Sequence, residues 1–346
     1  MMIRTLLIAA LPLLAACAEP APVPVRQDAA SPQSAPAWVT LTGEAPLVIA
    51  HRGASGYRPE HSESAYRLAF EQGADILEPD LMMSSDGQLI VRHDPYLSTS
   101  TDIADRPEFA DRRRTLMGRE DWWVMDFTAD ELRSLRVRQV FEDRSSDYDD
   151  RDPVLTLDDF FDLVEALEAE CRCTITTEPE VKLPAEHVAM GLDPLPALLD
   201  AMERRGLNRE GAPIIIQSFD APFLQRLRPL TPVILAMLDG GGDDPAYNAG
   251  GLSLDEIAAF ADAVGPHKSL LLNPDGSSTG YLEAARALGL AVHTWTVRDD
   301  RTPHVGESVE DELRALYALG VDGVFTDQPD TAVAVRAAMA AQAAAG

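Results

Sequence analysis

The stretch LVIAHRGASGYRPEHSESAYRLAFEQGADILEPDLM, residues 47–82, predicts the fold class. Residues 47–51 are apolar and partly β-branched, which is typical of a buried strand, and residues 75–82 predict a second strand. Between them, residues 62–72 have the apolar spacing of an amphipathic helix. Two strands joined through one helix lie parallel in a sheet, so this stretch predicts a βαβ unit of an α/β fold.

The same alternation continues to the end of the chain. The further strand candidates are 88–93, 173–181, 213–217, 232–237, 269–272, 290–296 and 321–325. The further helix candidates are 156–169, 193–205, 220–228, 253–264, 279–288, 307–319 and 329–341. We expect a single (β/α)8 TIM barrel rather than two doubly wound domains, because reactive side chains follow several successive strands. Nine strand candidates exceed eight, and the step from Asp80 to Leu89 is too short for a crossover helix, so the barrel is irregular there or one candidate lies outside it.

A long insertion follows the third strand candidate, at about residues 95–153. It contains Trp122, Trp123 and Phe127 and then an acidic run at 142–152. Loops at the carboxyl end of a barrel often cover the active site, so the insertion could cap that end. A packed surface subdomain is an equally good interpretation.

The first residues have the pattern of an export signal. Residues 1–16 combine Arg4 with a short apolar run, and Leu14-Ala15-Ala16-Cys17 resembles the lipobox of bacterial lipoproteins. We expect cleavage before Cys17 and a lipid on Cys17 that anchors the protein in the cell envelope, with the domain in the periplasm or at the cell surface. An ordinary signal peptide and an uncleaved anchor are the alternatives. Residues 17–44, rich in Ala and Pro, are predicted as a tether, and 45–346 as the barrel domain.

The charge balance excludes one class of partner. The chain has 29 basic and 57 acidic residues, a formal net charge of −28, and loss of 1–16 removes one Arg to give −29. So acidic a protein repels polyanions, which makes nucleic acid an improbable partner. Any phosphate that it binds must therefore be held by local cations or by a metal.

Cys171 and Cys173 are the cysteines outside the signal region. Residues two apart on a strand are too far apart for an unstrained disulfide, and two thiols alone make a poor zinc site. We expect a pair of small core side chains, with a local disulfide as the next interpretation.

Three carboxylates predict a metal site. Glu78 and Asp80 are two residues apart on a strand, so their side chains point to the same face and repel each other. A hard divalent cation would relieve that repulsion. Glu180, at the end of a later strand, is placed to complete the site, and Lys182 beside it is placed to meet a phosphate oxygen.

Two histidines predict acid–base chemistry. His51 and His93 each end a strand, and cleavage of a phosphodiester needs one group that accepts a proton and one that donates it. Arg52 offers bidentate contacts to phosphate, and Asp94 is placed to orient His93 or to bind the scaffold. His61 could touch the pocket, whereas four histidines are expected to be structural: His187, His267, His293 and His304.

In this order the motifs resemble the fingerprint of the glycerophosphodiester phosphodiesterase family. They are His51-Arg52-Gly53, Pro59-Glu60, Glu78-Pro79-Asp80, Asp86-Gly87, His93-Asp94 and Glu180-Val181-Lys182, followed by Gln217-Ser218-Phe219, Trp295-Thr296-Val297 and the run 322–327. Three segments look most like the periplasmic, calcium-using branch: 59–61, 102–105 and 125–128. The chain departs from the pattern at His61, where Asn is commoner, and at Pro79, which predicts a local irregularity of its strand.

The resemblance implies a barrel enzyme that hydrolyses glycerophosphodiesters to glycerol 3-phosphate and an alcohol. One divalent cation, Ca²⁺ with Mg²⁺ as the alternative, would be bound by Glu78, Asp80 and Glu180. His51 and His93 would be the acid and base, and Arg52 and Lys182 would bind the phosphate. Glu60, Asp94 and Trp295 would support or line the pocket. The alternatives are the same chemistry on a lysophospholipid or a polymeric glycerol phosphate, and a catalytically silent lipoprotein that binds at the cell surface.

Overall fold

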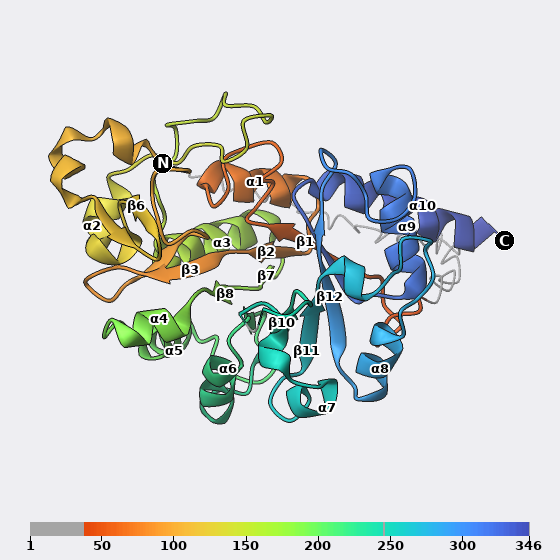
Figure 1. Ribbon diagram of the computed structural model, residues 1–346. Helices are drawn as coiled ribbons and strands as arrows, with labels where there is room; N and C mark the ends of the chain where they lie inside the picture. The colour runs from red at the N-terminus through yellow and green to blue at the C-terminus, as the bar shows by residue number, and fades with distance from the viewer. Residues whose placement is uncertain (1–37, 245, 346) are drawn as a thin grey trace, which may run out of the picture. The chain divides into compact units, whose positions relative to one another are not determined.

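The structure is a computed structural model that describes residues 38–244 and 246–345 (Figure 1). The predicted signal peptide 1–16, Cys17 and the tether up to residue 37 lie outside the described residues. Residues 38–44, which the sequence also placed in the tether, contact the folded domain: Trp38 packs edge-on against Tyr317, and the backbone N–H of Leu41 donates to Asp322. Among the helices of the described ranges, none combines the length and the apolarity that crossing a membrane requires.

Parallel strands form a closed barrel, as the alternation predicted. They are β1 (Leu47–His51), β2 (Ile76–Glu78), β3 (Asp80–Met83), β7 (Thr176–Thr177), β8 (Glu180–Val181), β9 (Ile215–Ser218), β10 (Ile234–Asp239), β11 (Ala263–Pro266), β12 (Ala291–Val297) and β13 (Gly323–Thr326). β2 and β3 are one barrel strand interrupted at Pro79, and β7 and β8 are another interrupted at residues 178–179, which leaves eight barrel strands. The last strand, β13, pairs with β1 and closes the barrel.

The irregularity at Pro79 was predicted, and its cause is local. Proline has no N–H for the ladder, so β2 ends at Glu78 and β3 begins at Asp80. The Pro79 carbonyl still accepts from the N–H of Glu180 at 2.8 Å, which keeps the two interrupted strands side by side. The carboxylates of Asp80 and Glu180 therefore remain at the same level of the barrel.

The surplus strand candidate, residues 88–93, is not a barrel strand. Residues 89–91 form β4 (Leu89–Val91), which pairs antiparallel with β3. The short connection contains Gly87 with φ +79°, a left-handed conformation that glycine adopts without steric cost. β3 and β4 are thus a hairpin, which explains why no crossover helix fits between Asp80 and Leu89.

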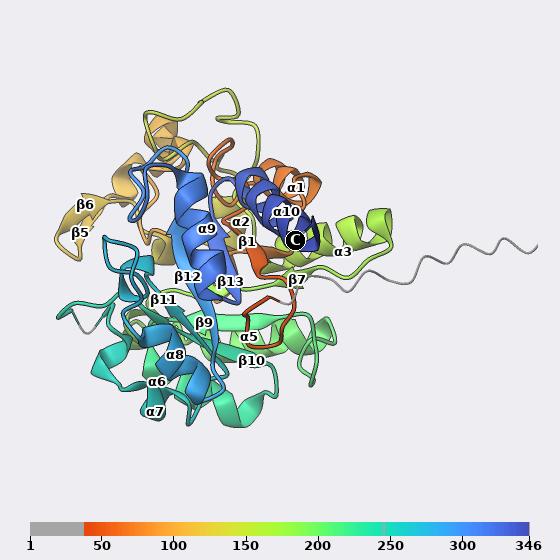
Figure 2. The ribbon, with the colours of Figure 1, turned by 90° about the vertical axis from the view of Figure 1, so that its right-hand side faces the viewer.

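Helices surround the barrel (Figure 2). They are α1 (Glu63–Glu71), α3 (Leu157–Cys171), α4 (Pro184–Ala189), α5 (Pro194–Arg204), α6 (Ala221–Leu227), α7 (Leu254–Ile257), α8 (Tyr281–Ala287), α9 (Val309–Leu319) and α10 (Pro329–Ala345). α3 illustrates how the local sequence determines where a helix begins and which of its residues are buried. It begins at a capping box in which Thr156 and Asp159 satisfy each other's backbone N–H groups, and it buries Phe160, Val164 and Leu167.

One predicted strand is wrong, and one predicted helix is longer than the helix in the structure. Residues 268–270 form a 3-10 turn rather than part of a strand at 269–272, and the predicted helix 253–264 shrinks to α7. The true strand is β11, whose Gly265 and Pro266 have low intrinsic strand preference. Pairing with β10 and β12 imposes the strand, and a Cβ added at Gly265 would meet the side chain of Leu238.

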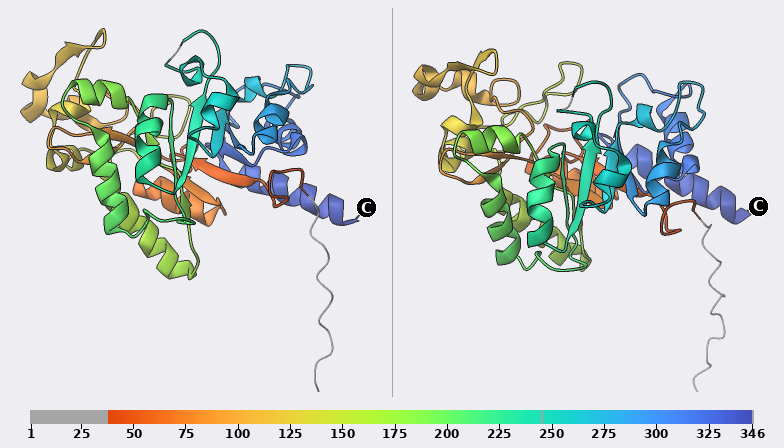
Figure 3. Two further views of the ribbon diagram at one scale, coloured as in Figure 1. Left: turned by 90° about the horizontal axis from the view of Figure 1, so that it is seen from below. Right: turned by 60° about the horizontal axis from the view of Figure 1, so that its bottom comes forward.

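The insertion, whose gold part lies at the upper left in both views of Figure 3, packs around a hydrophobic cluster that also includes Met82 of β3 and Ile90 of β4. It contains the hairpin β5 (Arg114–Leu116) and β6 (Arg119–Asp121) and the short helix α2 (Ala129–Arg133). Trp122 and Phe127 belong to this cluster, and Trp123 is buried with its indole N–H donating to the Arg114 carbonyl. These aromatic side chains are therefore used in packing, as the subdomain interpretation predicted.

Cys171 and Cys173 form an exposed disulfide, which corrects the expected pair of core side chains. The strand predicted from residue 173 begins only at Thr176, and Cys171 is the last residue of α3. Arg172 between them has φ +57° and ends the helix in a left-handed conformation. This turn brings the two Cα atoms within 5.2 Å, closer than residues two apart on a strand.

Candidate active site

The three predicted carboxylates meet at the carboxyl end of adjacent strands. Glu78 ends β2, Asp80 begins β3 and Glu180 begins β8, with Asp80 in register with Glu180. One oxygen of each can be chosen so that all three lie within 4.8 Å of one another, and all three residues are buried. The Gln217 amide donates to Glu78 at 3.3 Å. This is an all-oxygen donor set of the kind that hard divalent cations prefer.

Burial and mutual repulsion shape the pKa values of this cluster. Burial and the neighbouring Asp80 raise the pKa of Glu78 well above its usual range. Burial raises the pKa of Glu180 to about 7, although Lys182 opposes the shift. Burial also acts to raise the pKa of Asp80, but Arg52 and Lys182 hold it well below its usual range. Three such carboxylates fit a divalent cation, whose charge would stabilise all of them in the ionised form.

Arg52 lies between the carboxylates and the loop after β1. Its Nη1 donates to Glu60 at 2.7 Å, its Nε is 3.0 Å from Asp80, and its backbone N–H donates to Glu78 at 2.9 Å. Glu60 therefore holds the guanidinium, in line with its predicted supporting position. His61 lies beside it, buried, with Nε2 2.9 Å from Asp80 and Nδ1 2.9 Å from the Tyr66 hydroxyl.

Lys182 lies across the cluster from Arg52. Its ammonium is 2.8 Å from Glu180 and 4.0 Å from Asp80. Although burial opposes it, the charge of Glu180 raises the pKa of Lys182, so the group stays cationic. The site thus carries two cations beside three carboxylates.

His51 ends β1, and its ring is held by Asp327, the residue after β13. The His51 Nδ1 is 2.7 Å from Oδ1 of Asp327, while Oδ2 accepts from Arg144 and Arg298, each at 2.7 Å. Burial, followed by the charge of Arg52, lowers the pKa of His51 to about 4. Burial acts to raise the pKa of Asp327, but the hydrogen bond with His51 and the two arginines hold it far below its usual range.

His93 follows β4 and pairs with the next residue. Its Nδ1 is 2.8 Å from Oδ1 of Asp94, and the Thr99 hydroxyl donates to Oδ2 at 3.2 Å. Burial, followed by Arg52 and Lys182, lowers the pKa of His93 to about 4. Because both histidines carry a carboxylate on Nδ1, the Nε2 atom of each is left for the site.

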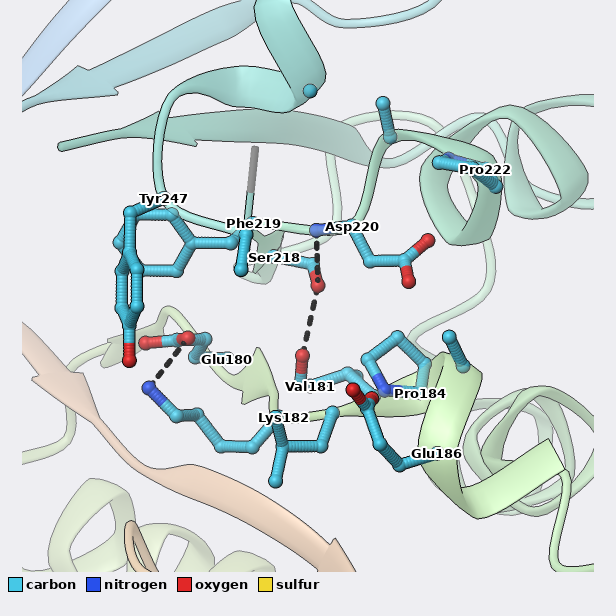
Figure 4. Close-up of a pocket in the computed structure, with 15 residues that line it drawn as sticks. Glu180, Val181, Lys182, Pro184, Glu186, Ser218, Phe219, Asp220, Pro222 and Tyr247 are labelled. Carbon is cyan, nitrogen blue, oxygen red and sulfur yellow. Dashed lines mark hydrogen bonds and ion pairs between the residues drawn. The ribbon is translucent and has the colours of Figure 1, made fainter. Parts of the chain in front are cut away.

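A cavity of about 160 Å³ is lined by both histidines and by two of the candidate metal ligands, Glu78 and Glu180. Trp295 forms part of its wall and stacks edge-on with Phe219 and with His267. A second cavity, about 240 Å³, is shown in Figure 4. It shares four lining residues with the first, namely Glu180, Lys182, Phe219 and Tyr247, and continues past the start of α4 and of α6.

The structure thus brings all ten predicted site residues to one end of the barrel, and it adds others. Asp327 and Gln217 stood in the sequence only as parts of motifs, although Asp327 directly follows a strand, β13. No role was predicted from the sequence for Arg144 or Arg298. His267, which was expected to be structural, lines the cavity. His293 lies in the barrel interior, hydrogen-bonded to buried Glu178 at 3.0 Å.

The closed barrel and the side chains at its carboxyl end define a TIM-barrel enzyme. The family model described as "Glycerophosphoryl diester phosphodiesterase family" matches residues 51–331 of the chain. The chain belongs to this family and is a phosphoric diester hydrolase.

Among similar proteins, the glycerophosphodiester phosphodiesterase of Haemophilus influenzae is 32% identical over 327 residues, which cover 83% of this chain and 88% of the relative. A solved structure from Silicibacter pomeroyi, named "Putative glycerophosphoryl diester phosphodiesterase", superimposes with a TM-score of 0.67 at 23% identity, covering 87% and 98% of the two chains. A phosphodiesterase of Oleispira antarctica, solved with the product sn-glycerol-3-phosphate, gives a TM-score of 0.61 at 20% identity, with 86% and 98% covered. The two structural matches confirm the barrel.

Proposed function

We propose that the protein hydrolyses glycerophosphodiesters to glycerol 3-phosphate and an alcohol in a reaction that requires one divalent cation. The observation that carries this proposal is the buried cluster of three carboxylates beside two histidines, each held at Nδ1 by a carboxylate. Glycerophosphocholine and glycerophosphoethanolamine are representative substrates. Glycerol 3-phosphate bound to the Oleispira antarctica neighbour is consistent with this product.

Glu78, Asp80 and Glu180 would hold the cation, which would polarise a phosphoryl oxygen and position the diester. Oxygen donors suit Ca²⁺, our first choice, and Mg²⁺ is the alternative. Arg52 and Lys182 would bind the remaining phosphate oxygens, and both already lie within 4.0 Å of Asp80 beside the cluster. The substrate phosphate would thus meet local cations in a protein whose overall charge repels it.

His51 and His93 would carry the protons. Each would donate its Nδ1 hydrogen to its carboxylate partner, which leaves Nε2 for proton transfer. One Nε2 would accept the proton of the attacking oxygen, from water or from the glycerol 2-hydroxyl; the other histidine, already protonated at Nε2, would donate that proton to the leaving alcohol. Glu60 would hold Arg52, Asp94 would orient His93, and Trp295 would form the apolar wall.

The second cavity favours an alternative substrate class. Its lining includes the apolar residues Val181, Leu183 and Pro184, and its polar members are Glu180, Lys182, Glu186, Ser218 and Asp220. A lysophospholipid or a polymeric glycerol phosphate could extend into it from the same phosphate position. The chemistry would be unchanged.

The first test is glycerol 3-phosphate release from glycerophosphocholine by protein lacking residues 1–17. We expect release with Ca²⁺, less with Mg²⁺ and none with chelator, and we expect Glu78→Gln to abolish it. The exposed Glu108→Gln is the matched control. Full activity in chelator or in Glu78→Gln would refute the metal site, and faster turnover of lysophosphatidylcholine would favour the alternative substrate.

We also propose that the protein is a lipoprotein of the cell envelope, in the periplasm or at the cell surface, and that it belongs to the periplasmic, calcium-dependent branch of the family. The support is the sequence around Cys17. Metabolic labelling with radioactive palmitate should mark the wild type and not Cys17→Ser. Labelling of both would refute lipidation at Cys17.

A further inference from the structure

One segment of the insertion, residues 139–144, packs beside the catalytic end of the barrel. The Gln139 amide donates to the Ser55 carbonyl at 3.2 Å, in the loop that follows β1. Arg144 lies at the end of the segment, and its side chain is only 3% exposed although no helix or strand contains it. An arginine buried in a loop must satisfy its donors with specific partners.

The partners of Arg144 fix its guanidinium group on three sides. Asp300 accepts from Nε at 2.6 Å and from Nη2 at 3.1 Å, and the Ser55 carbonyl accepts from Nη1 at 3.1 Å. Nη2 also donates to Oδ2 of Asp327 at 2.7 Å. The last contact is made to the carboxylate whose Oδ1 holds His51.

We propose that Arg144 is a positioning residue that keeps the His51 ring in its catalytic orientation by acting through Asp327. The inference rests on the proposed function, in which the His51 ring transfers a proton. Arg144 and Arg298 bind the same oxygen, Oδ2, so Asp327 cannot rotate about its side-chain torsions without breaking two charged hydrogen bonds. Its other oxygen then stays on the His51 Nδ1, and Nε2 stays directed into the cavity.

Arg301 supplies a matched control. It joins the same two segments, because its guanidinium binds Asp143 at 2.7 Å and lies 3.5 Å from Asp300. Both Arg144 and Arg301 also lie over the ring of Phe141, at 4.4 and 4.7 Å. Among the described residues, Arg301 forms no hydrogen bond or ion pair with Asp327, so comparing the two arginines separates docking of the insertion from positioning of His51.

The test compares Arg144→Met with Arg301→Met in the full-length protein. We expect kcat on glycerophosphocholine to fall about 10- to 100-fold in Arg144→Met, because a misplaced catalytic group slows the chemical step. KM should change less than about twofold, since no substrate contact is removed. Arg301→Met should keep the wild-type kcat. Arg144→Lys should restore part of the rate, because an ammonium can retain one ion pair with Asp327.

A double-mutant cycle with His51→Ala completes the test. Once His51 is absent, adding Arg144→Met should cause no further loss of kcat. An additive loss, equal losses in Arg144→Met and Arg301→Met, or a wild-type kcat in Arg144→Met would each overturn the positioning role. If Arg144→Met does not fold, a lowered kcat in Arg144→Lys at an unchanged melting temperature supports it, and a wild-type kcat overturns it. Full activity of His51→Ala would instead refute the proposed acid–base pair itself.

Discussion

The two histidines of the site face one cavity but are held in different ways. The partner of His51 is Asp327, which is 276 positions away in the sequence, is 2% exposed and is fixed by two arginines. The partner of His93 is the adjacent Asp94, which is 19% exposed and is supported by the Thr99 hydroxyl. The His51 ring is 13% exposed and the His93 ring 33%. The orientation of the His51 ring therefore depends on closure of the barrel, whereas that of the His93 ring depends on a local loop.

We infer from this difference which histidine would serve which side of the proposed reaction. A rigid, enclosed imidazole suits the proton transfer at the attacking oxygen, whose position must be held closely. A more exposed imidazole suits protonation of an alcohol that has to leave. Lys182 lines both cavities and is among the charges that lower the pKa of His93.

Replacement of each histidine should give the largest effects. We expect His51→Ala and His93→Ala each to lower kcat/KM on glycerophosphocholine by about 10²- to 10⁴-fold, the usual contribution of one acid or base. A nitrophenyl leaving group needs no proton, so a nitrophenyl diester should recover most of the loss in His93→Ala but little in His51→Ala. The measurement is kcat/KM on both substrates.

His304→Gln would be a poor control, because Nε2 of this half-buried ring donates to the Leu272 carbonyl; the exposed Asp130→Asn serves better. Equal recovery in the two histidine variants would break the assignment of acid and base.

Replacement of the two carboxylate partners should give smaller and unequal effects. Asp327→Asn removes the buried charge on which two arginines and His51 converge, so we expect a loss of roughly 100-fold in kcat. Asp94→Asn removes a partner that is more exposed than Asp327, and solvent can replace part of its effect, so we expect roughly a 10-fold loss. Steady-state kinetics of both variants, with melting temperatures as the control for folding, will test the order. An equal or reversed order would show that closure of the barrel does not hold His51 more tightly.

The pH dependence of kcat/KM compares the protonation of His51 with that of His93. Burial lowers the pKa of both rings to about 4, so both imidazoles are neutral at pH 7 and remain neutral as the pH falls towards 4. A base acts in its neutral form and an acid in its protonated form, so at saturating metal we expect little change in kcat/KM between pH 7 and 5 on account of His51 and a rise on account of His93. NMR titration of the imidazoles, assigned with the two alanine variants, measures this directly. A ring that titrates near 6.5 would show that it is solvated rather than buried.

The same contrast explains which parts of the site could be predicted from the sequence. Glu78, Asp80 and Glu180 were found because strand periodicity places alternate side chains on one face and parallel strands end at the same edge. Asp94 was found because it is adjacent to His93. Asp327 and Arg144 received no role, because their contacts with the His51 side depend on barrel closure and on how the insertion docks.

The fold shows a similar division. Regular alternation of apolar strands and amphipathic helices predicted the barrel, and Pro79 predicted the break between β2 and β3. The strand β11 was missed because Gly265 and Pro266 give no local strand signal. The apolar run after it, residues 269–272, resembles a strand and was predicted as one instead. Leu271 and Leu272 in that run are buried in the core without belonging to a strand.

The sequence by itself determined the barrel class, the family resemblance and the chemical groups at the strand ends, because periodicity and motif order are local properties of the chain. The tertiary structure decided that β4 is a hairpin strand, that Cys171 and Cys173 form a disulfide, and that Asp327 and Arg144 support His51. Such contacts join residues that are distant in sequence or that depend on a backbone turn, and only packing of the whole domain brings those atoms within bonding distance.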